Sequence, residues 1–226
     1  MTVRTSSAML AGMERAEIIL RAYQPADEAA VRRICFETAL FGGPIRSVLD
    51  DEALVSEALV GYYLRYATDL LFVAEVDGVV AGYLGGCADT ARYRRTYAWR
   101  IAPWLVLRFL LRGHWLRPQL WPWLLAGVRV ARLKSASHAR IATDYPAHGH
   151  LNLASAFRHQ GIGWLLLEHF LNELRRRGVR GLHISANSPG GQAFFARAGF
   201  KRLLDYPLPP LPGQPPRRVQ IMGFRV

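Results

Sequence analysis

Hydrophobic and polar residues follow two different periods along this chain, which together predict a domain that mixes strands and helices. Short apolar runs bounded by turn residues predict strands at about 17–21, 71–76, 79–84, 149–154, 181–186, 200–204 and 219–226. Apolar residues three or four positions apart predict helices at about 25–39, 49–66, 164–177 and 188–198. Asp77-Gly78, between two apolar runs, is the strongest hairpin signal.

One of these predicted helices begins at a junction that contains two glycines. The strand at 149–154 is followed by Arg158-His159-Gln160-Gly161-Ile162-Gly163, and the helix starts directly after it. A helix N-terminus leaves backbone N–H groups unpaired and carries the positive end of the helix dipole. Glycine lets a bulky anion approach the backbone closely. The junction therefore predicts a cradle for a pyrophosphate; the alternative is that Gly161 and Gly163 only make a tight turn.

Residues 91–140 differ from the rest of the chain. They hold eleven Arg and Lys residues, no Asp or Glu, and five of the six tryptophans. They therefore carry nearly all of the chain's formal net charge of +12. We expect two or three basic amphipathic helices, broken near Pro103, Gly113, Pro118 and Pro122.

Four interpretations of this basic segment stay open. It could form a lid over a substrate site or the contact surface of a homodimer, which we favour. It could make a peripheral contact with an anionic membrane. It could bind nucleic acid, the least favoured partner. The plain alternative is two packed helices whose solvent-exposed faces happen to be rich in arginine.

Length and composition favour one folded soluble domain. The chain has 226 residues, 51% of them hydrophobic, which is enough to bury a sizeable core. No apolar run approaches the roughly 20 residues that a membrane-spanning helix needs. Cys35 and Cys87 are far apart and lack metal-ligand spacing, so we expect reduced cysteines, no metal site and a cytoplasmic protein. We expect residues 1–16 to form a flexible tail and 17–226 a single domain, with the basic segment inserted at 91–140.

Two motifs in this order of elements resemble the GNAT superfamily of N-acetyltransferases. One runs from Leu151 to Gly163 and includes the glycine junction. The other is Gln192-Ala193-Phe194-Phe195-Ala196-Arg197-Ala198-Gly199-Phe200, which resembles the family's closing helix and strand. The resemblance covers about 17–90 and 148–226 and leaves the basic segment outside. It implies an α/β (α+β) fold with a mixed, mostly antiparallel central sheet of about seven strands flanked by helices.

The resemblance also implies a cofactor, acetyl-coenzyme A, and an amine acceptor. Backbone N–H groups from His159 to Trp164 would hold the pyrophosphate, and Leu153 with Ala154 would meet the pantetheine arm as if it were an added strand. The implied cofactor-binding residues are Leu153, Ala154, Arg158, His159, Gln160, Gly161, Ile162, Gly163, Trp164, Asn187, Ser188 and Phe194.

A narrower resemblance lies just before the first motif. Residues 145–151 resemble the entry to this strand in acetyltransferase-like domains attached to some O-GlcNAc hydrolases, and some such domains are thought not to catalyse acetyl transfer. Two functions therefore stay open. One is an N-acetyltransferase in which a primary amine of a small molecule or protein attacks acetyl-CoA directly in a ternary complex. The other is a non-catalytic acyl-CoA-binding regulatory domain.

The candidate catalytic bases are Asp144, His148 and His150, on or just before the central strand. The two histidines alternate along the strand and should share one face, and neutral histidine suits a base near pH 7. The alternative is a hydrogen-bonding role for each histidine and a turn or capping role for Asp144. The family's usual acid is a tyrosine, where this chain has Phe195. A thiol pKa of roughly 8.5 lets the thiolate leave without that acid.

Overall fold

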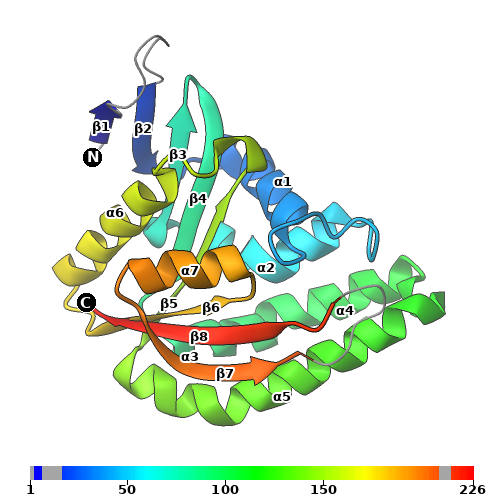
Figure 1. Cartoon of the computed structure of the whole chain (residues 1–226). Helices are drawn as coiled ribbons and strands as arrows, with labels where there is room; N and C mark the ends of the chain where they lie inside the picture. The colour runs from blue at the N-terminus through cyan, green and yellow to red at the C-terminus, as the bar shows by residue number, and fades with distance from the viewer. Residues whose placement is uncertain (1–2, 7–16, 209–214) are drawn as a thin grey trace.

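The computed structural model of the chain describes residues 3–6, 17–208 and 215–226. Their strands form one eight-stranded sheet in the order β1-β2-β3-β4-β5-β6-β8-β7 (Figure 1). The strands are β1 (Val3–Ser6), β2 (Glu17–Ala22), β3 (Leu71–Val76), β4 (Val79–Cys87), β5 (Ala147–Leu153), β6 (Gly181–Ala186), β7 (Lys201–Pro207) and β8 (Arg218–Arg225). Every neighbouring pair is antiparallel except β5 with β6.

The predicted mixed, mostly antiparallel sheet of seven strands is confirmed, and the structure adds an eighth strand. Strand β1 pairs with β2 from Val3 opposite Leu20 to Ser6 opposite Glu17. The sequence analysis assigned these residues to a flexible tail, because four residues carry too little periodicity to be recognised alone. The predicted hairpin joins β3 and β4. Asp77 and Gly78 have φ of 49° and 79°, the positive values that a tight two-residue hairpin turn needs at both positions.

Four helices lie close to their predicted positions: α1 (Glu28–Thr38), α2 (Glu52–Tyr66), α6 (Ile162–Arg176) and α7 (Pro189–Arg197). Helix α2 begins later than expected because Asp51 caps it, accepting a hydrogen bond of 3.0 Å from the Leu54 N–H. Helices α6 and α7 pack on one face of the sheet, and α1 and α2 pack on the other.

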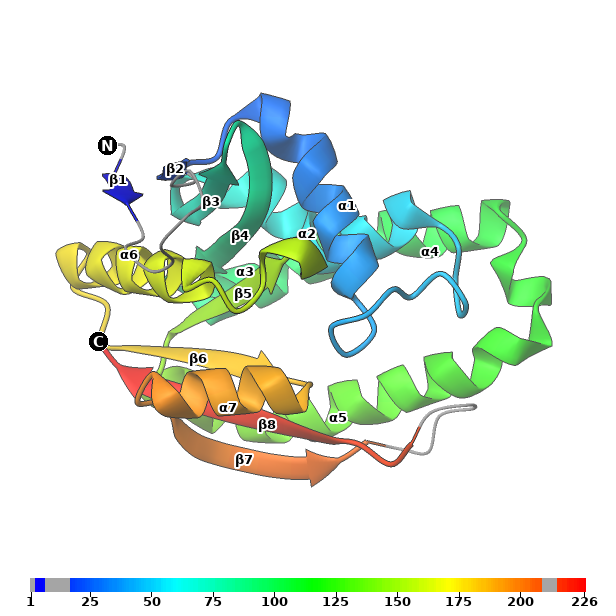
Figure 2. The ribbon, with the colours of Figure 1, turned by 45° about the horizontal axis from the view of Figure 1, so that its top comes forward.

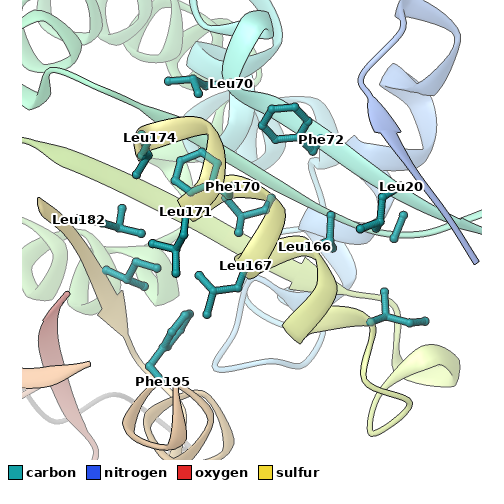
Figure 3. Packing of buried hydrophobic residues seen from close by; sticks show 14 of the residues in the cluster. Leu20, Leu70, Phe72, Leu166, Leu167, Phe170, Leu171, Leu174, Leu182 and Phe195 are labelled. Atoms are coloured by element: carbon teal, nitrogen blue, oxygen red, sulfur yellow. The ribbon is translucent and has the colours of Figure 1, made fainter. Parts of the chain in front are cut away.

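The core around α6 fixes the position of the glycine junction. The helix turns one apolar face inward, and this face meets side chains from the sheet and from α7 (Figure 3). The buried residues drawn there include Leu20, Leu70, Phe72, Leu166, Leu167, Phe170, Leu171, Leu174, Leu182 and Phe195. Each fully buried side chain of this size stabilises the fold by roughly 1.5–3 kcal/mol relative to exposure. This packing holds the N-terminus of α6 against the end of β5.

The basic segment forms a long helical hairpin. It comprises α3 (Thr90–Thr96), a π-helical stretch (Tyr97–Ile101), α4 (Ala102–Leu111), two short turns and α5 (Trp121–Asp144). Pro122 lies in the first turn of α5, where its missing N–H costs nothing. Pro103 comes just after the π-helical stretch and, contrary to the expectation, does not break the helical run. Figure 2 shows α4 and the adjoining part of α5 extending beyond the strands.

Candidate active site

The sheet opens between its two parallel strands. Strands β5 and β6 pair only at Ala147 opposite Leu182 and His148 opposite His183. Strand β5 then continues to Leu153 while still paired with β4, and β6 diverges from it (Figure 2). Within the described residues, the backbone of 149–153 therefore has no strand neighbour on its β6 side. Such an edge can pair with an extended ligand that carries amide groups.

A cavity of about 710 Å³ lies at this opening, beside the N-terminus of α6. Gly161 is the N-cap of α6 and has a left-handed backbone with φ of 80°, and the preceding His159 has φ of 63°. The residues that line the cavity come from β5, the glycine junction, the loop after α1 and the start of α7. They are Phe41, Gly42, Leu151, Asn152, Leu153, Arg158, His159, Gly161, Gly163, Trp164, Ser188, Pro189, Gly190, Gly191, Phe194, Phe195 and Arg197. The free N–H groups of α6 give this cavity an anion-binding end.

The Arg158 side chain holds the rim of this cavity together. Its Nη2 donates a hydrogen bond of 2.8 Å to the Gly42 carbonyl, and its Nε donates one of 3.3 Å to the Leu153 carbonyl. Arg158 thus ties the loop after α1 to the end of β5 while adding positive charge to the lining.

A second cavity, of about 600 Å³, adjoins the first along β5 and β6. His148, Gly149 and His150 line it, whereas Leu151 to Leu153 line the first cavity. After the end of β6, Asn187 lines this second cavity and Ser188 lines the first. The remaining lining residues are Ala58, Leu59, Tyr63, Thr90, Tyr93, Arg94, Tyr97, Ala98, His183 and Ser185. No Asp or Glu in the described part of the chain lines this second cavity.

Known proteins share the sequence pattern and the fold that surround these two cavities. A sequence model described as "Acetyltransferase (GNAT) family" matches residues 117–200, which contain β5, the glycine junction, α6 and α7. The matched residues carry the acetyltransferase pattern of the GNAT family. The match takes in 117–140, which the sequence analysis placed outside the resemblance.

Solved structures with the same fold match 92% of this chain. The crystal structure of SsHAT is 27% identical over 98% of its chain, with a TM-score of 0.67. A polyamine N-acetyltransferase from Drosophila melanogaster, which forms N-acetylagmatine, is 16% identical over 100% of its chain, with a TM-score of 0.60. The structure of yncA from Salmonella typhimurium, solved with its cofactor acetyl-CoA, is 14% identical over 93% of its chain, with a TM-score of 0.55. Members of this family use acetyl-CoA.

Most of the predicted cofactor-binding residues line the larger cavity. These are Leu153, Arg158, His159, Gly161, Gly163, Trp164, Ser188 and Phe194. Four do not. Ile162, in the first turn of α6, is fully buried in the core and does not face the cavity. Gln160 is exposed and donates to the Ala156 carbonyl, Ala154 packs against the core on the α1–α2 face, and Asn187 lines the second cavity.

The ring of His148 is held at its Nδ1 by two neighbouring side chains. Its Nδ1 lies 3.2 Å from the Thr90 Oγ1 and 3.0 Å from the Cys87 Sγ. The Thr90 hydroxyl donates its one proton to the Pro146 carbonyl at 2.7 Å, so its oxygen can only accept from the histidine. The contact with Thr90 suits a ring proton on Nδ1 and a lone pair on Nε2, whereas a proton donated by the Cys87 thiol would suit the opposite tautomer. Burial raises the pKa of the Cys87 thiol to about 12, so Cys87 stays a neutral thiol beside the ring.

His150 has a different environment from its neighbour. Burial lowers the pKa of His150 to about 4, against a hydrogen bond to the Leu59 backbone, so the ring is neutral at pH 7. Its Nε2 lies 3.1 Å from the Asn152 Nδ2, which also donates to the Tyr83 hydroxyl at 2.9 Å. The Nε2 lone pair of His150 thus accepts from Asn152. The two histidines, equal candidates in the sequence, differ because only the structure fixes their hydrogen-bond partners.

The surroundings of Asp144, His183 and Phe195 decide what each of these residues can do. Asp144 is the last residue of α5, exposed, and lines neither cavity. His183 of β6 donates from Nδ1 to the Tyr145 carbonyl at 2.8 Å and also lines the second cavity. Phe195 is buried between Phe194 and Phe200, so this position offers no proton donor.

Sequence reasoning missed the aromatic wall of the second cavity. Tyr63 comes from α2, and Tyr93 and Tyr97 come from the beginning of the basic segment. The Tyr93 ring lies edge-on to the His148 ring, with 4.4 Å between their centroids. The spacing of Tyr93 and Tyr97 by four residues marks one face of a helix. No sequence signal showed that this face meets β5.

Proposed function

We propose that this GNAT acetyltransferase transfers acetyl from acetyl-CoA to a primary amine by direct attack in a ternary complex. The observation that carries the proposal is the pair of adjoining cavities at the opening between β5 and β6, one at the glycine junction and one around His148. Acetyl-CoA, when bound, supplies an acetyl thioester that an amine can attack. The larger cavity takes the cofactor, and the smaller one takes the acceptor.

The cofactor side rests on backbone groups more than on side chains. The N–H groups at the start of α6 suit a pyrophosphate, and the left-handed Gly161 turns them toward the cavity. The unpaired β6 side of 149–153 suits the amides of a pantetheine arm. Leu153, Trp164 and Phe194 supply apolar contacts around it. The chain's formal net charge of +12 favours the approach of an anionic cofactor.

His148 is the proposed catalytic base. Its Nε2 accepts a proton from the amine nitrogen as that nitrogen bonds to the thioester carbon and the carbon–sulfur bond breaks. Thr90 and Cys87 hold Nδ1 and so orient the ring. With Phe195 at the family's tyrosine position, the sulfur leaves as a thiolate, which a thiol pKa of about 8.5 permits.

The second cavity favours an acceptor that carries no second positive charge. Three tyrosines and Arg94 line it, with no carboxylate among the described lining residues. An uncharged aromatic or apolar amine, or one that carries an acidic group, fits such a lining. The Drosophila relative forms N-acetylagmatine; we expect cationic acceptors of that kind to be poor substrates here.

A second function, acyl-CoA binding without catalysis, is favoured by one observation, the buried Phe195 where a tyrosine is expected. The narrower resemblance of residues 145–151 to the acetyltransferase-like domains of O-GlcNAc hydrolases points the same way and stays a prediction.

A thiol-release assay with acetyl-CoA and a panel of amines tests the proposal. The panel should include an arylalkylamine, several amino acids, agmatine and spermidine. We expect turnover with an acceptor from the first two groups and a loss of about 10²–10⁴ in kcat/KM for His148→Gln. The matched control His150→Gln should lose far less, because that lone pair is already engaged.

Calorimetry with acetyl-CoA separates the remaining outcomes. Tight binding without turnover of any amine would favour the non-catalytic function. No binding would contradict both functions. Equal activity of His148→Gln and the wild type would remove His148 as the base while leaving the transferase assignment intact.

A further inference from the structure

The helical hairpin formed by α4, the turns after it and the start of α5 exposes an apolar surface of unusual extent. Twelve of the sixteen large hydrophobic residues that are exposed in the described part of the chain lie between Trp99 and Val128. They are Trp99, Trp104, Val106, Leu107, Leu110, Leu111, Trp115, Leu116, Trp121, Leu124, Leu125 and Val128. We call this set the hairpin surface. Soluble monomers rarely expose so many contiguous apolar side chains without a partner for them.

The orientation of α4 is fixed from the inside. Its one charged residue, Arg108, points toward the protein, where its Nη2 lies 3.0 Å from the Asp51 Oδ1. His114, buried in the turn after α4, places its Nε2 3.1 Å from the other oxygen of the same carboxylate. The Tyr97 hydroxyl donates to the Ala58 carbonyl at 3.0 Å. These contacts hold one side of α4, on which Leu105 and Phe109 are also half-buried, against the protein and leave its other apolar residues outward.

The apolar side forms stripes that a flat partner can cover. Trp104, Leu107 and Leu111 are spaced by three and four residues along α4, and all are exposed. Trp121, Leu124, Leu125 and Val128 form the corresponding stripe on α5. At the tip between the helices, Leu111 and Leu116 are 77% and 65% exposed.

Charge identifies the partner. Exposed arginines flank the hairpin surface, with Arg112 and Arg117 at the tip and Arg100 and Arg129 farther along the helices. No Asp or Glu occurs anywhere in 91–140. A two-fold contact with a second copy would bring this surface against itself, arginine against arginine, without a carboxylate from the segment. Nucleic acid would leave the leucine and valine stripes uncovered, since bases stack on aromatic rings.

We infer that the hairpin surface binds peripherally to an anionic lipid bilayer. Trp and Leu side chains enter the boundary between head groups and acyl chains, while the arginines reach lipid phosphates. No helix in the described part of the chain is long and apolar enough to cross a membrane, which is consistent with helices that lie on the surface. Each Arg close to an anionic bilayer contributes about 1 kcal/mol, or about a fivefold gain in affinity.

Vesicle flotation with the full chain tests this inference. We expect the protein to float with vesicles of phosphatidylcholine containing about 30 mol % phosphatidylglycerol and at least about tenfold less with phosphatidylcholine alone. Trp104→Ser/Leu107→Ser/Leu111→Ser should weaken binding at least about tenfold. Arg112→Gln/Arg117→Gln should weaken it by about 25-fold and reduce its salt dependence.

The controls keep folding separate from binding. Tyr66→Ser/Val79→Ser removes two exposed apolar side chains outside the hairpin and should bind vesicles like the wild type. Circular dichroism and acetyl-CoA binding should be unchanged in the serine and glutamine variants. Equal flotation with both kinds of vesicle, or no loss in either variant, would overturn the inference. A dimer in sedimentation that the triple variant converts to a monomer would instead assign the surface to a second copy.

Discussion

Helices α6 and α4 are both rich in leucine, yet the fold uses them in opposite ways. Helix α6 buries its apolar face completely against the sheet. Helix α4 is the more apolar of the two and buries none of its residues. The difference lies in the polar contacts, because Asp51 holds Arg108 inward, and Leu107, Leu110 and Leu111 on the other side of α4 therefore face solvent. Periodicity tells which residues share a face of a helix, but the partners of the polar residues decide which face turns inward.

The largest expected effect that separates these helices is on stability. Phe170→Ala in α6 should cost about 3–5 kcal/mol of unfolding free energy, because it leaves a cavity in the middle of the core. Leu107→Ala in α4 removes an exposed side chain and should change stability by less than about 0.5 kcal/mol in the absence of lipid. Urea unfolding of both variants in dilute buffer is the measurement. A comparable loss for Leu107→Ala would show that α4 is buried in solution and would break the comparison.

The contact that orients α4 should give the next largest effect. Asp51→Ala removes the N-cap of α2 and the partner of both Arg108 and His114, at a cost of about 2–3 kcal/mol. Asp51→Asn keeps an oxygen for the cap and should lose less. Urea unfolding measures both variants, and the difference in stability between the wild type and Asp51→Asn isolates the ionic contribution. An Asp51→Asn variant as stable as the wild type would mean that the cap alone accounts for the loss in Asp51→Ala.

Acid should weaken the same contact. Desolvation raises the pKa of Asp51, but hydrogen bonds from Arg108, His114 and the Leu54 N–H outweigh it and lower the pKa to about 2. The pKa of Asp51 is lower in the folded state than its unfolded value of about 3.9, so the ionised carboxylate stabilises the fold at pH values above about 3.9. This stabilisation is lost as the pH falls toward 2. The stability difference between wild type and Asp51→Asn should therefore shrink from about pH 5 to about pH 2. A difference that is constant over this range would contradict the assignment.

The smallest expected effects come from the two glycines of the junction and should differ in kind. Gly161→Ala should destabilise the fold by about 1 kcal/mol, because φ of 80° strains any residue with a side chain. At Gly163 an added Cβ would meet Leu153 and Phe194 carbons at ordinary distances of 3.4–3.6 Å. Gly163→Ala should leave stability unchanged or raised but weaken acetyl-CoA binding by about tenfold, since it narrows the cavity. Thermal unfolding and calorimetry distinguish the two variants. If Gly163→Ala bound acetyl-CoA as tightly as the wild type, the proposed position of the cofactor beside this residue would be wrong.

Much of the fold and half of the candidate site could be predicted from local signals. The hairpin at Asp77-Gly78 and the face of α6 follow from turn chemistry and helical period, and the glycine junction depends on residues close together in the chain. The acceptor side could not be predicted in this way. It joins His148 of β5 to Tyr63 of α2 and Tyr93 of α3, which lie far apart in the sequence. The choice between His148 and His150 likewise depends on Thr90 and Asn152, whose distances no pattern of residues gives.

By itself the sequence determined the order of strands and helices, the family resemblance and the position of the anion-binding junction, because each depends on neighbouring residues. It also determined that one segment is basic and rich in tryptophan. Only the tertiary structure decided that β5 and β6 separate after His148, that Thr90 and Cys87 contact the Nδ1 of its ring, and that Leu107, Leu110 and Leu111 of α4 face outward. Each of these depends on a contact between elements distant in sequence, and such contacts are set by packing and hydrogen bonding in the folded chain.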